Sequence, residues 1–521
     1  MTKFNKAGAR TRIGTTPIQA PAAPTIVNHQ GGEGYERDAK SELFMLGVAN
    51  LVGEKTFGEK GMQRDERFIN SIHAVALQDP TWVAGFLPWL RKEANLRSAP
   101  IMGALEAAKA MVDAKIPGAR AIVAASMDRP DEPGEALAYW MTNYGRSIPK
   151  PVKRGIADGA RRLYSEKALL KYDTQGKPFR FADVIDLCHP KPDAWWRSDL
   201  FRYALDRRHG RVTEIPESLK LIRARHAVKG VAIEALDERE IRAAGMTWEN
   251  TISAAVDKKE AWEKQILAGM GYMALLRNLR NFDEAGVSDE IAKLVIDKLT
   301  DPIEVRRSRQ FPFRFLSASR EVNNLRWAYP LEVALNLSLA NVPELTGDTL
   351  IMVDRSGSMF IPLAEHGRTS QADIAAIFGS ALHMRNREHS TLVEYGTSSA
   401  TINPPAGMSV LNVIKHFSNL GWTQTYAAIQ RHLTQKHTRV ILITDEQHTG
   451  MPPHLAVPDN IPLYVFNLVG YHAASMPTNR NRVTIGGGLT DASFKLIGLL
   501  ESGRNGNWPW LEDHEEGTGG D

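Results

Sequence analysis

The chain has 521 residues, enough for two or more domains, with 43% hydrophobic and 24% charged residues and the single cysteine Cys188. The sequence lacks the roughly 20-residue apolar run of a membrane helix and a secretory signal, so we expect a cytoplasmic protein. With one cysteine, it cannot form an internal disulfide or a thiolate-rich zinc site. The net charge of +4 is uneven, because residues 1–345 carry +8 and residues 346–521 carry −4, which allows a polyanionic partner for the first part.

The first two thirds of the chain are expected to be helical, after a segment without periodicity. Residues 1–37 are rich in Pro, Ala, Thr and Gly and are predicted to be disordered. In residues 38–342, apolar side chains recur at the three- and four-residue spacing of amphipathic helices, and short connectors favour an irregular array of stacked helix pairs. The expected helices include Phe44–Val52, Phe68–Leu77, Met102–Val112, Ala119–Met127, Ala136–Tyr144, Val184–Leu187, Ile266–Leu279 and Leu331–Leu339.

Residues 343–503 instead alternate between expected strands and helices, which favours a parallel sheet covered by helices. The strands are expected at Leu350–Val353, Thr391–Tyr395, Val440–Thr444 and Leu463–Leu468. The helices are expected at Gln371–Arg385, Val410–Phe417, Thr425–Leu433 and Ala492–Leu500. Residues 504–521 are acidic and are predicted to form a solvated tail.

Oxygen-bearing side chains gather where these strands are expected to end. Asp354, Ser356 and Ser358 follow one strand directly, Thr423 lies just before a helix, and Asp445 ends another strand. Because the carboxyl ends of parallel strands meet at one edge of a sheet, the five side chains are expected to converge. An oxygen-only set suits Mg²⁺ or Mn²⁺ and is wrong for structural zinc. The alternative is an Asp/Ser turn that merely caps the next helix.

This pattern resembles the von Willebrand factor A domain and its metal-ion-dependent adhesion site (MIDAS), whose Asp-x-Ser-x-Ser, Thr and Asp elements match these five residues. The resemblance implies a Rossmann-like α/β fold and a divalent cation, most often Mg²⁺, whose open coordination position is filled by an oxygen of a partner. Trp422 departs from the family, which often has a second glycine there, and is expected to narrow access to Thr423.

An A domain behind a helical array is the order found in the Ro autoantigen (TROVE) family, and this chain resembles a Ro-related protein of bacterial or phage type. The segments that carry the resemblance are Leu87–Glu93, Val184–Pro192 and Ala274–Asn281. The resemblance implies a monomeric ring of HEAT-like repeats, closed by the A domain, that acts in RNA quality control or as an RNA-degradation scaffold. Small structured non-coding (Y-like) RNA would bind its outer surface, 3′ ends of misfolded RNA would enter its central hole, and an exoribonuclease or other protein would dock at the metal site.

Basic residues support an RNA-binding interpretation. Seven cations cluster around one expected helix, where a shared face could contact phosphates without sequence preference; they are Lys150, Lys153, Arg154, Arg161, Arg162, Lys167 and Lys171. His189 matches a histidine of the family's Leu-x-His-x-Lys-Pro segment, and Arg277 and Arg280 on a second expected helix could line the hole. The alternatives are a solvated helix face for the cations and a hydrogen-bonded structural role for His189.

We do not expect an enzyme. A metal-dependent nuclease needs a cluster of carboxylates, no P-loop is present, and Glu446 and His448 are interpreted as ordinary loop residues. A second hypothesis is a metal-dependent protein-interaction scaffold that does not bind RNA.

Overall fold

The computed structural model describes residues 26–27, 33–34, 39–49, 61–94, 96–360, 370–405, 407–448, 450–468, 475–476, 482–485, 493–502 and 510. Most of the two segments predicted to be disordered or solvated, 1–37 and 504–521, lies outside these residues. Two short antiparallel strands, β1 (Ile26–Val27) and β2 (Glu33–Gly34), precede the first helix. Among the described residues, no helix is long and apolar enough to cross a membrane.

Helices make up the described structure from residue 39 to residue 341. They are α1 (Ala39–Ala49), α2 (Gly61–Gln78), α3 (Pro80–Lys92), α4 (Ser98–Asp113), α5 (Ala119–Ala125), α6 (Glu132–Tyr144), α7 (Lys150–Leu163), α8 (Glu166–Tyr172), α9 (Phe181–Cys188), α10 (Trp195–Arg208), α11 (Lys220–Ala227), α12 (Glu238–Ala243), α13 (Trp248–Ala254), α14 (Lys258–Leu267), α15 (Tyr272–Arg277), α16 (Leu279–Glu284), α17 (Asp289–Leu299), α18 (Pro302–Ser308), α19 (Pro312–Glu321) and α20 (Ala328–Ser338). Most of the helices expected from the apolar spacing are therefore present, and several begin earlier than the apolar residues alone indicated.

The C-terminal part is built on a six-stranded sheet in the order β5-β4-β3-β6-β7-β8. Its strands are β3 (Asp348–Asp354), β4 (Ser390–Tyr395), β5 (Ser399–Thr401), β6 (His437–Thr444), β7 (Leu463–Asn467) and β8 (Arg482–Ile485). Its helices are α21 (Gln371–Arg385), α22 (Val410–Val413), α23 (Thr425–His432) and α24 (Ser493–Ser502). Alternate residues of β3 face opposite sides of the sheet, so that Ile351 and Val353 share a core with α21 and α24, whereas Leu350 and Met352 pack with α23.

Three sequence predictions about elements are wrong. The sheet is mixed rather than parallel, because β5 turns back beside β4 as an antiparallel edge. The expected helix Ile266–Leu279 is divided, since Gly269 adopts a positive φ of 103° after α14 and Asn278 interrupts the chain between α15 and α16. The cations from 150 to 171 lie on two helices, α7 and α8, rather than on one. Ser165 has an extended backbone and precedes α8, which it caps, because its side chain accepts a hydrogen bond from the Ala168 N–H.

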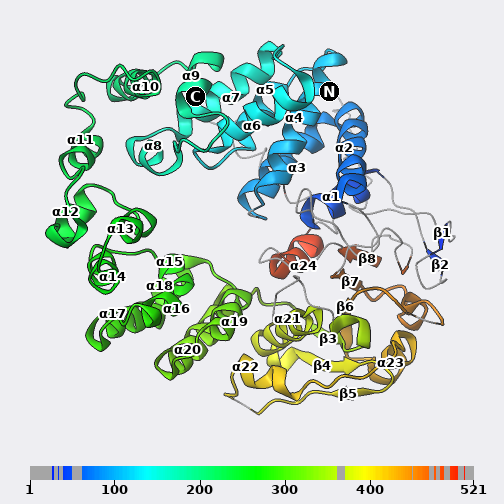
Figure 1. Ribbon diagram of the computed structural model, residues 1–521. Helices are drawn as coiled ribbons and strands as arrows, with labels where there is room; N and C mark the ends of the chain where they lie inside the picture. The colour runs from blue at the N-terminus through cyan, green and yellow to red at the C-terminus, as the bar shows by residue number, and fades with distance from the viewer. Residues whose placement is uncertain are drawn as a thin grey trace, which may run out of the picture.

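The helices follow a curved path, and the sheet with its helices lies between the two ends of that path (Figure 1). At one end, Phe313 of α19 stacks on Phe378 of α21 and packs at a tilt against Phe494 of α24, with ring centroids 6.3 and 5.3 Å apart. At the other end, Trp510, beyond α24, packs against Phe86 of α3 with centroids 5.1 Å apart. The C-terminal part therefore contacts both ends of the helical part, and the chain closes on itself.

Candidate metal centre and nucleic-acid interface

The five predicted metal ligands lie together at the carboxyl edge of the sheet. Asp354 ends β3 and Asp445 follows β6, and these strands are direct neighbours in parallel register. The Ser356 N–H donates to Asp354 Oδ1 at 2.9 Å, and the hydroxyl oxygens of Ser356 and Ser358 are 3.3 Å apart. Sequence order alone thus identified side chains that the fold brings to one place, as expected for the ends of adjacent parallel strands.

Backbone hydrogen bonds hold the Asp354 turn against the loop that carries Thr423. The Gly357 N–H donates to the Gly421 carbonyl at 2.7 Å, and the Leu420 N–H donates to the Arg355 carbonyl at 2.9 Å. Gly421 has a positive φ of 71°, which glycine adopts without strain. The two loops therefore form the walls of one pocket.

This pocket has a volume of about 280 Å³ and opens to solvent at the edge of the sheet. Its lining residues are Ser356, Gly357, Ser358, Gly421, Trp422, Thr423 and Gln447. Thr423 is 5% exposed, whereas Trp422 is 75% exposed beside it. Whether Trp422 narrows access to Thr423 stays a prediction, although Trp422 does line the pocket.

Two buried carboxylates give the site its electrostatic character. Asp354 is fully buried, and this burial, together with the charge of Asp445, raises the pKa of Asp354 to about 7. Burial also raises the pKa of Asp445 above its usual value. Two neighbouring acids that resist ionisation in the absence of a cation are the expected environment of a divalent metal, which would favour both charged forms. The oxygen set and the open pocket fit Mg²⁺ or Mn²⁺.

Sequence reasoning missed two supporting residues. The Thr444 hydroxyl donates to Asp354 Oδ2 at 2.6 Å, and Thr444 is the last residue of β6. The buried Arg355 guanidinium donates to the carbonyls of Ser418 and Ala372 at 2.9 and 2.8 Å, so it ties the turn to two other segments. The position of Thr444 directly before Asp445 was a signal that the sequence offered. The role of Arg355 depends on distant segments, so no sequence signal pointed to it.

Glu446 and His448, which were interpreted as ordinary loop residues, are both buried after β6. Glu446, 2% exposed, accepts hydrogen bonds from the Ser475 N–H at 3.0 Å and the Ser475 hydroxyl at 2.7 Å, and one from the Asn467 amide. Burial lowers the pKa of His448. Among the residues that the structure describes, no group of three or more His, Cys, Asp or Glu side chains is placed to hold a metal ion.

The predicted RNA-contacting cations lie on α7 and on α8. Lys150, Arg154, Lys167 and Lys171 are exposed, and no ion pair to them is found within the described parts of the chain. Arg162 is different, because its Nη2 donates to the carbonyls of Ala124 and Met127 at the end of α5. Lys153 and Arg161 are half-buried, and Arg161 lies 3.7 Å from Asp158.

Cations of α7 lie near residues of α9 and α10. The charge of Lys153 acts on Cys188, whose pKa burial raises to about 12, and the charge of Arg161 adds to burial in lowering the pKa of Arg197. His189 caps α9 in a left-handed conformation with φ 53°, and its backbone N–H donates to Ile185 at 2.9 Å. Its side chain is exposed, so the backbone has the structural role and the ring faces solvent.

The second basic set does not share one helix. Arg277 ends α15 and Arg280 belongs to α16, and both are exposed. Arg280 is held by two acids, Glu284 at 3.3 Å and Glu321 at 3.1 Å. Arg277 has no ion pair among the described residues, so it is the more available of the two.

Comparison with known proteins agrees with the sequence resemblance. Residues 241–329 match the TROVE domain family. Over 80 residues, the chain is 41% identical to telomerase protein component 1 of Mus musculus and 40% identical to that of Rattus norvegicus, which is 15% of this chain and 3% of either relative. The crystal structure of the Deinococcus radiodurans RO (RSR) protein superposes with a TM-score of 0.65 at 16% identity, over 90% of this chain and 99% of that one. Residues 241–329 therefore resemble a TROVE domain, and the fold of the chain is similar to that of the Deinococcus radiodurans RO (RSR) protein.

Proposed function

We propose that this protein binds non-coding RNA, with structured, Y-like RNA on its outer basic surface and 3′ ends of misfolded RNA in a central ring of HEAT-like repeats. The observation that carries the proposal is the set of exposed cations on α7 and α8 that have no ion pair among the described residues, Lys150, Arg154, Lys167 and Lys171, together with the exposed ring of His189. Phosphate contacts from such side chains give affinity that does not depend on sequence and that falls with salt. RNA quality control, or a scaffold for RNA degradation, is the role that this binding would serve.

Charge reversal on α7 tests the proposal. Lys150 and Arg154 are one helical turn apart, so they present charge on one face. Reversing both to Glu is expected to weaken binding of a structured RNA at least tenfold and to reduce the salt slope by about 1 for each lost phosphate contact. A matched control reverses Lys259 and Lys293, two exposed lysines on α14 and α17. Equal losses in both variants would show that only overall charge matters.

Capture of RNA ends needs a separate experiment. We compare a hairpin RNA that has a single-stranded 3′ tail with the same hairpin ending in a blunt duplex, at several salt concentrations. End capture predicts tighter binding of the tailed RNA, whereas equal affinities would argue against it.

The C-terminal part, residues 343–503, is proposed to be a von Willebrand factor A domain whose MIDAS binds Mg²⁺ through Asp354, Ser356, Ser358, Thr423 and Asp445. The 280 Å³ pocket beside these side chains leaves room for an oxygen of a partner protein, such as an exoribonuclease. This pocket also favours the second candidate function, a metal-dependent interaction scaffold without RNA binding. Under that function, the α7 reversals would leave partner binding intact and no RNA would be retained. In either case we propose a monomeric cytoplasmic protein without catalytic activity.

A further inference from the structure

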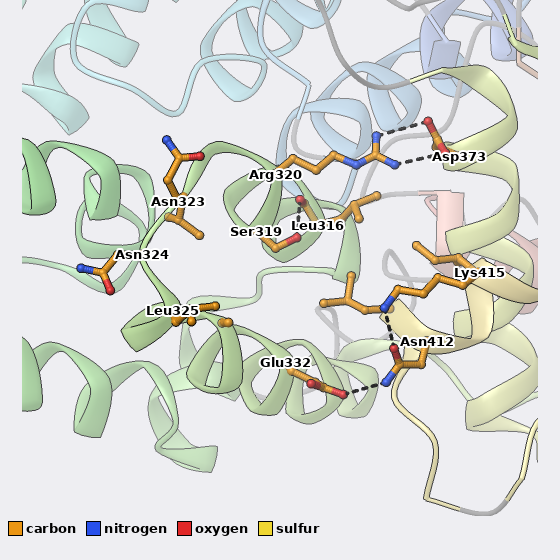
Figure 2. A pocket seen from close by; sticks show the side chains of 14 residues that line it. Leu316, Ser319, Arg320, Asn323, Asn324, Leu325, Glu332, Asp373, Asn412 and Lys415 are labelled. Carbon is orange, nitrogen blue, oxygen red and sulfur yellow. Dashed lines mark hydrogen bonds and ion pairs between the residues drawn. The ribbon is translucent and has the colours of Figure 1, made fainter.

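A second, larger pocket lies where the helical part meets the C-terminal part, and its charged side chains bond one another or Asn412. Its volume is about 490 Å³, between α19 and α20 on one side and α21 and α22 on the other (Figure 2). Arg320 binds both carboxylate oxygens of Asp373, at 3.1 and 3.2 Å. The Asn412 amide donates to Glu332 at 3.4 Å, and its carbonyl accepts from Lys415 at 2.9 Å. The pocket is therefore a polar seam between the two parts rather than a place for a charged ligand.

An exposed aromatic side chain lies elsewhere, near the basic helix α7. Trp195, the first residue of α10, is 73% exposed. Of the tryptophans that the structure describes, only Trp195 and Trp422 are exposed, and Trp422 lines the metal pocket. Single exposed apolar side chains are common on protein surfaces. The exposure of Trp195 therefore has a meaning only through what surrounds it.

Helix α7 runs beside the stretch of chain that leads to Trp195. Helix α9 contacts both α7 and α10. The charge of Lys153 acts on Cys188 at the end of α9. Two turns further along α7, Arg161 lies near enough to Arg197, in the first turn of α10, for its charge to act there as well. The segment between these two points, which carries Trp195, therefore lies alongside α7.

The Trp195 ring faces solvent from a well-held helical turn. The buried residues of α10 lie on the opposite side of the helix from Trp195, at 3.6 residues per turn; they are Leu200, Phe201 and Ala204. In the same first turn, Arg197 packs over the ring of Trp196, 4.6 Å from its centroid, and forms an ion pair with Asp193. These contacts fix the backbone that carries Trp195, so its ring is presented to a partner without a large loss of conformational freedom.

The charge around Trp195 favours an anionic partner. Over residues 186–197, two acids and two cations balance, so the excess of positive charge comes from α7. That helix carries five cations and one acid, Asp158, whose Oδ2 already accepts a hydrogen bond from Arg120 at 2.6 Å. RNA offers both phosphates for the cations and flat bases for an aromatic ring.

We propose that Trp195 stacks on an unpaired base of an RNA whose phosphates contact the α7 cations. This inference rests on the proposed RNA-binding function and adds what the surface distinguishes. In a duplex, the faces of the bases are covered by their neighbours, so a side chain reaches the face of an internal base only where that base has left the stack. Every base has such a face, so stacking does not depend on base identity. The surface should therefore prefer a stem interrupted by an unpaired nucleotide to a continuous duplex.

Two RNA duplexes with the same blunt ends test the inference on the full-length protein. One is fully paired, and the other carries a single unpaired 2-aminopurine. The wild type is expected to bind the interrupted duplex roughly fivefold or more tightly, and the fluorescence of 2-aminopurine should fall on binding, because stacking quenches it. Trp195→Ala should lose both the preference and the quenching, whereas Trp195→Phe should keep most of both. Tyr329→Ala, at an aromatic side chain of α20 that is 74% exposed, is the matched control and should behave like the wild type.

The outcomes separate this inference from the proposed function. Equal affinity of the wild type for the two duplexes, or an equal loss for both in Trp195→Ala, would overturn the inference, leave RNA binding standing and assign the exposed ring to a protein partner. If Lys150→Glu combined with Arg154→Glu weakens both duplexes while Trp195→Ala weakens only the interrupted one, phosphate contact and base stacking are separate contributions, as inferred. Binding of neither duplex would refute the proposed function, and the inference with it.

Discussion

Replacing Trp510 with Ala is expected to open the contact between the C-terminal end and the first helices. Trp510 is 5% exposed and lies 5.2 Å, centroid to centroid, from both Trp82 and Trp89. Gly85 makes room for it, because a Cβ on Gly85 would lie 2.4 Å from Trp510 Cδ1. The substitution removes one large side chain from an aromatic cluster and leaves its neighbours partly open to water.

The size of the effect follows from this burial. Truncating a buried Trp to Ala typically costs about 3–5 kcal/mol, and each aromatic pair contributes about 0.5–1.5 kcal/mol beyond the area it buries. Because Trp510 is at one end of the described chain, where neighbours can relax into the space, we expect about 3 kcal/mol. The control is Trp422→Ala, at a side chain that is 75% exposed, for which we expect less than about 0.5 kcal/mol.

Urea unfolding, followed by far-ultraviolet circular dichroism, measures the change. Small-angle scattering of the folded variants then tests whether Trp510→Ala increases the radius of gyration. Gly85→Ala should mimic the loss in the wild type and add little in the Trp510→Ala background, since the two positions act on one contact. Equal urea midpoints for Trp510→Ala and Trp422→Ala would refute the reasoning.

Two further predictions concern buried carboxylates. Without a cation, ionised Asp354 destabilises the fold as the pH rises from its ordinary pKa of 3.8 to about 7, so Asp354→Asn should be the more stable protein in EDTA at pH 8, by a few kcal/mol at about 1.4 kcal/mol per pKa unit. Thermal melts should show that Mg²⁺ stabilises only the wild type. The affinity of the Asp354→Asn variant for RNA should equal that of the wild type. An Asn variant that is less stable than the wild type in EDTA would contradict this account. Burial opposes ionisation of Glu106, but hydrogen bonds from His73, Tyr144 and Tyr139 outweigh it and lower the pKa of Glu106. The stabilisation from ionised Glu106 is present above the unfolded pKa of about 4.5 and is lost as the pH falls below it. Glu106→Gln should therefore reduce the drop in urea midpoint between about pH 5 and pH 3. An unchanged drop would exclude Glu106 as its source.

The sequence predicted best where one period or one strand end determined the structure. The helix Gln371–Arg385 and the convergence of Asp354 with Asp445 follow from apolar spacing and from parallel strand ends. Prediction from the sequence failed where the backbone leaves the helical conformation within a continuous apolar pattern, as at Gly269 and at Ser165. The short strands β5 and β8 have only three and four residues and were missed, because their position at or near the sheet edge depends on neighbours rather than on composition.

The pocket between the two parts could not be predicted, since it depends on how distant segments meet. Arg320 and Asp373 are 53 residues apart, and Glu332 and Asn412 are 80 residues apart. Opposite charges and amides at such separations are common in any sequence. Their meaning comes only from the folded arrangement.

The contact of Trp510 with α3 also changes what a cut in the chain would do. In an open chain of stacked helices, cleavage between α10 and α11 would separate the two sides of the cut. Here the fragments would remain joined elsewhere, because Trp510 of the C-terminal fragment packs on α3 of the N-terminal fragment. The protein should therefore tolerate one nick, or new termini placed in residues 209–219 by circular permutation, and should fall apart only after a second break.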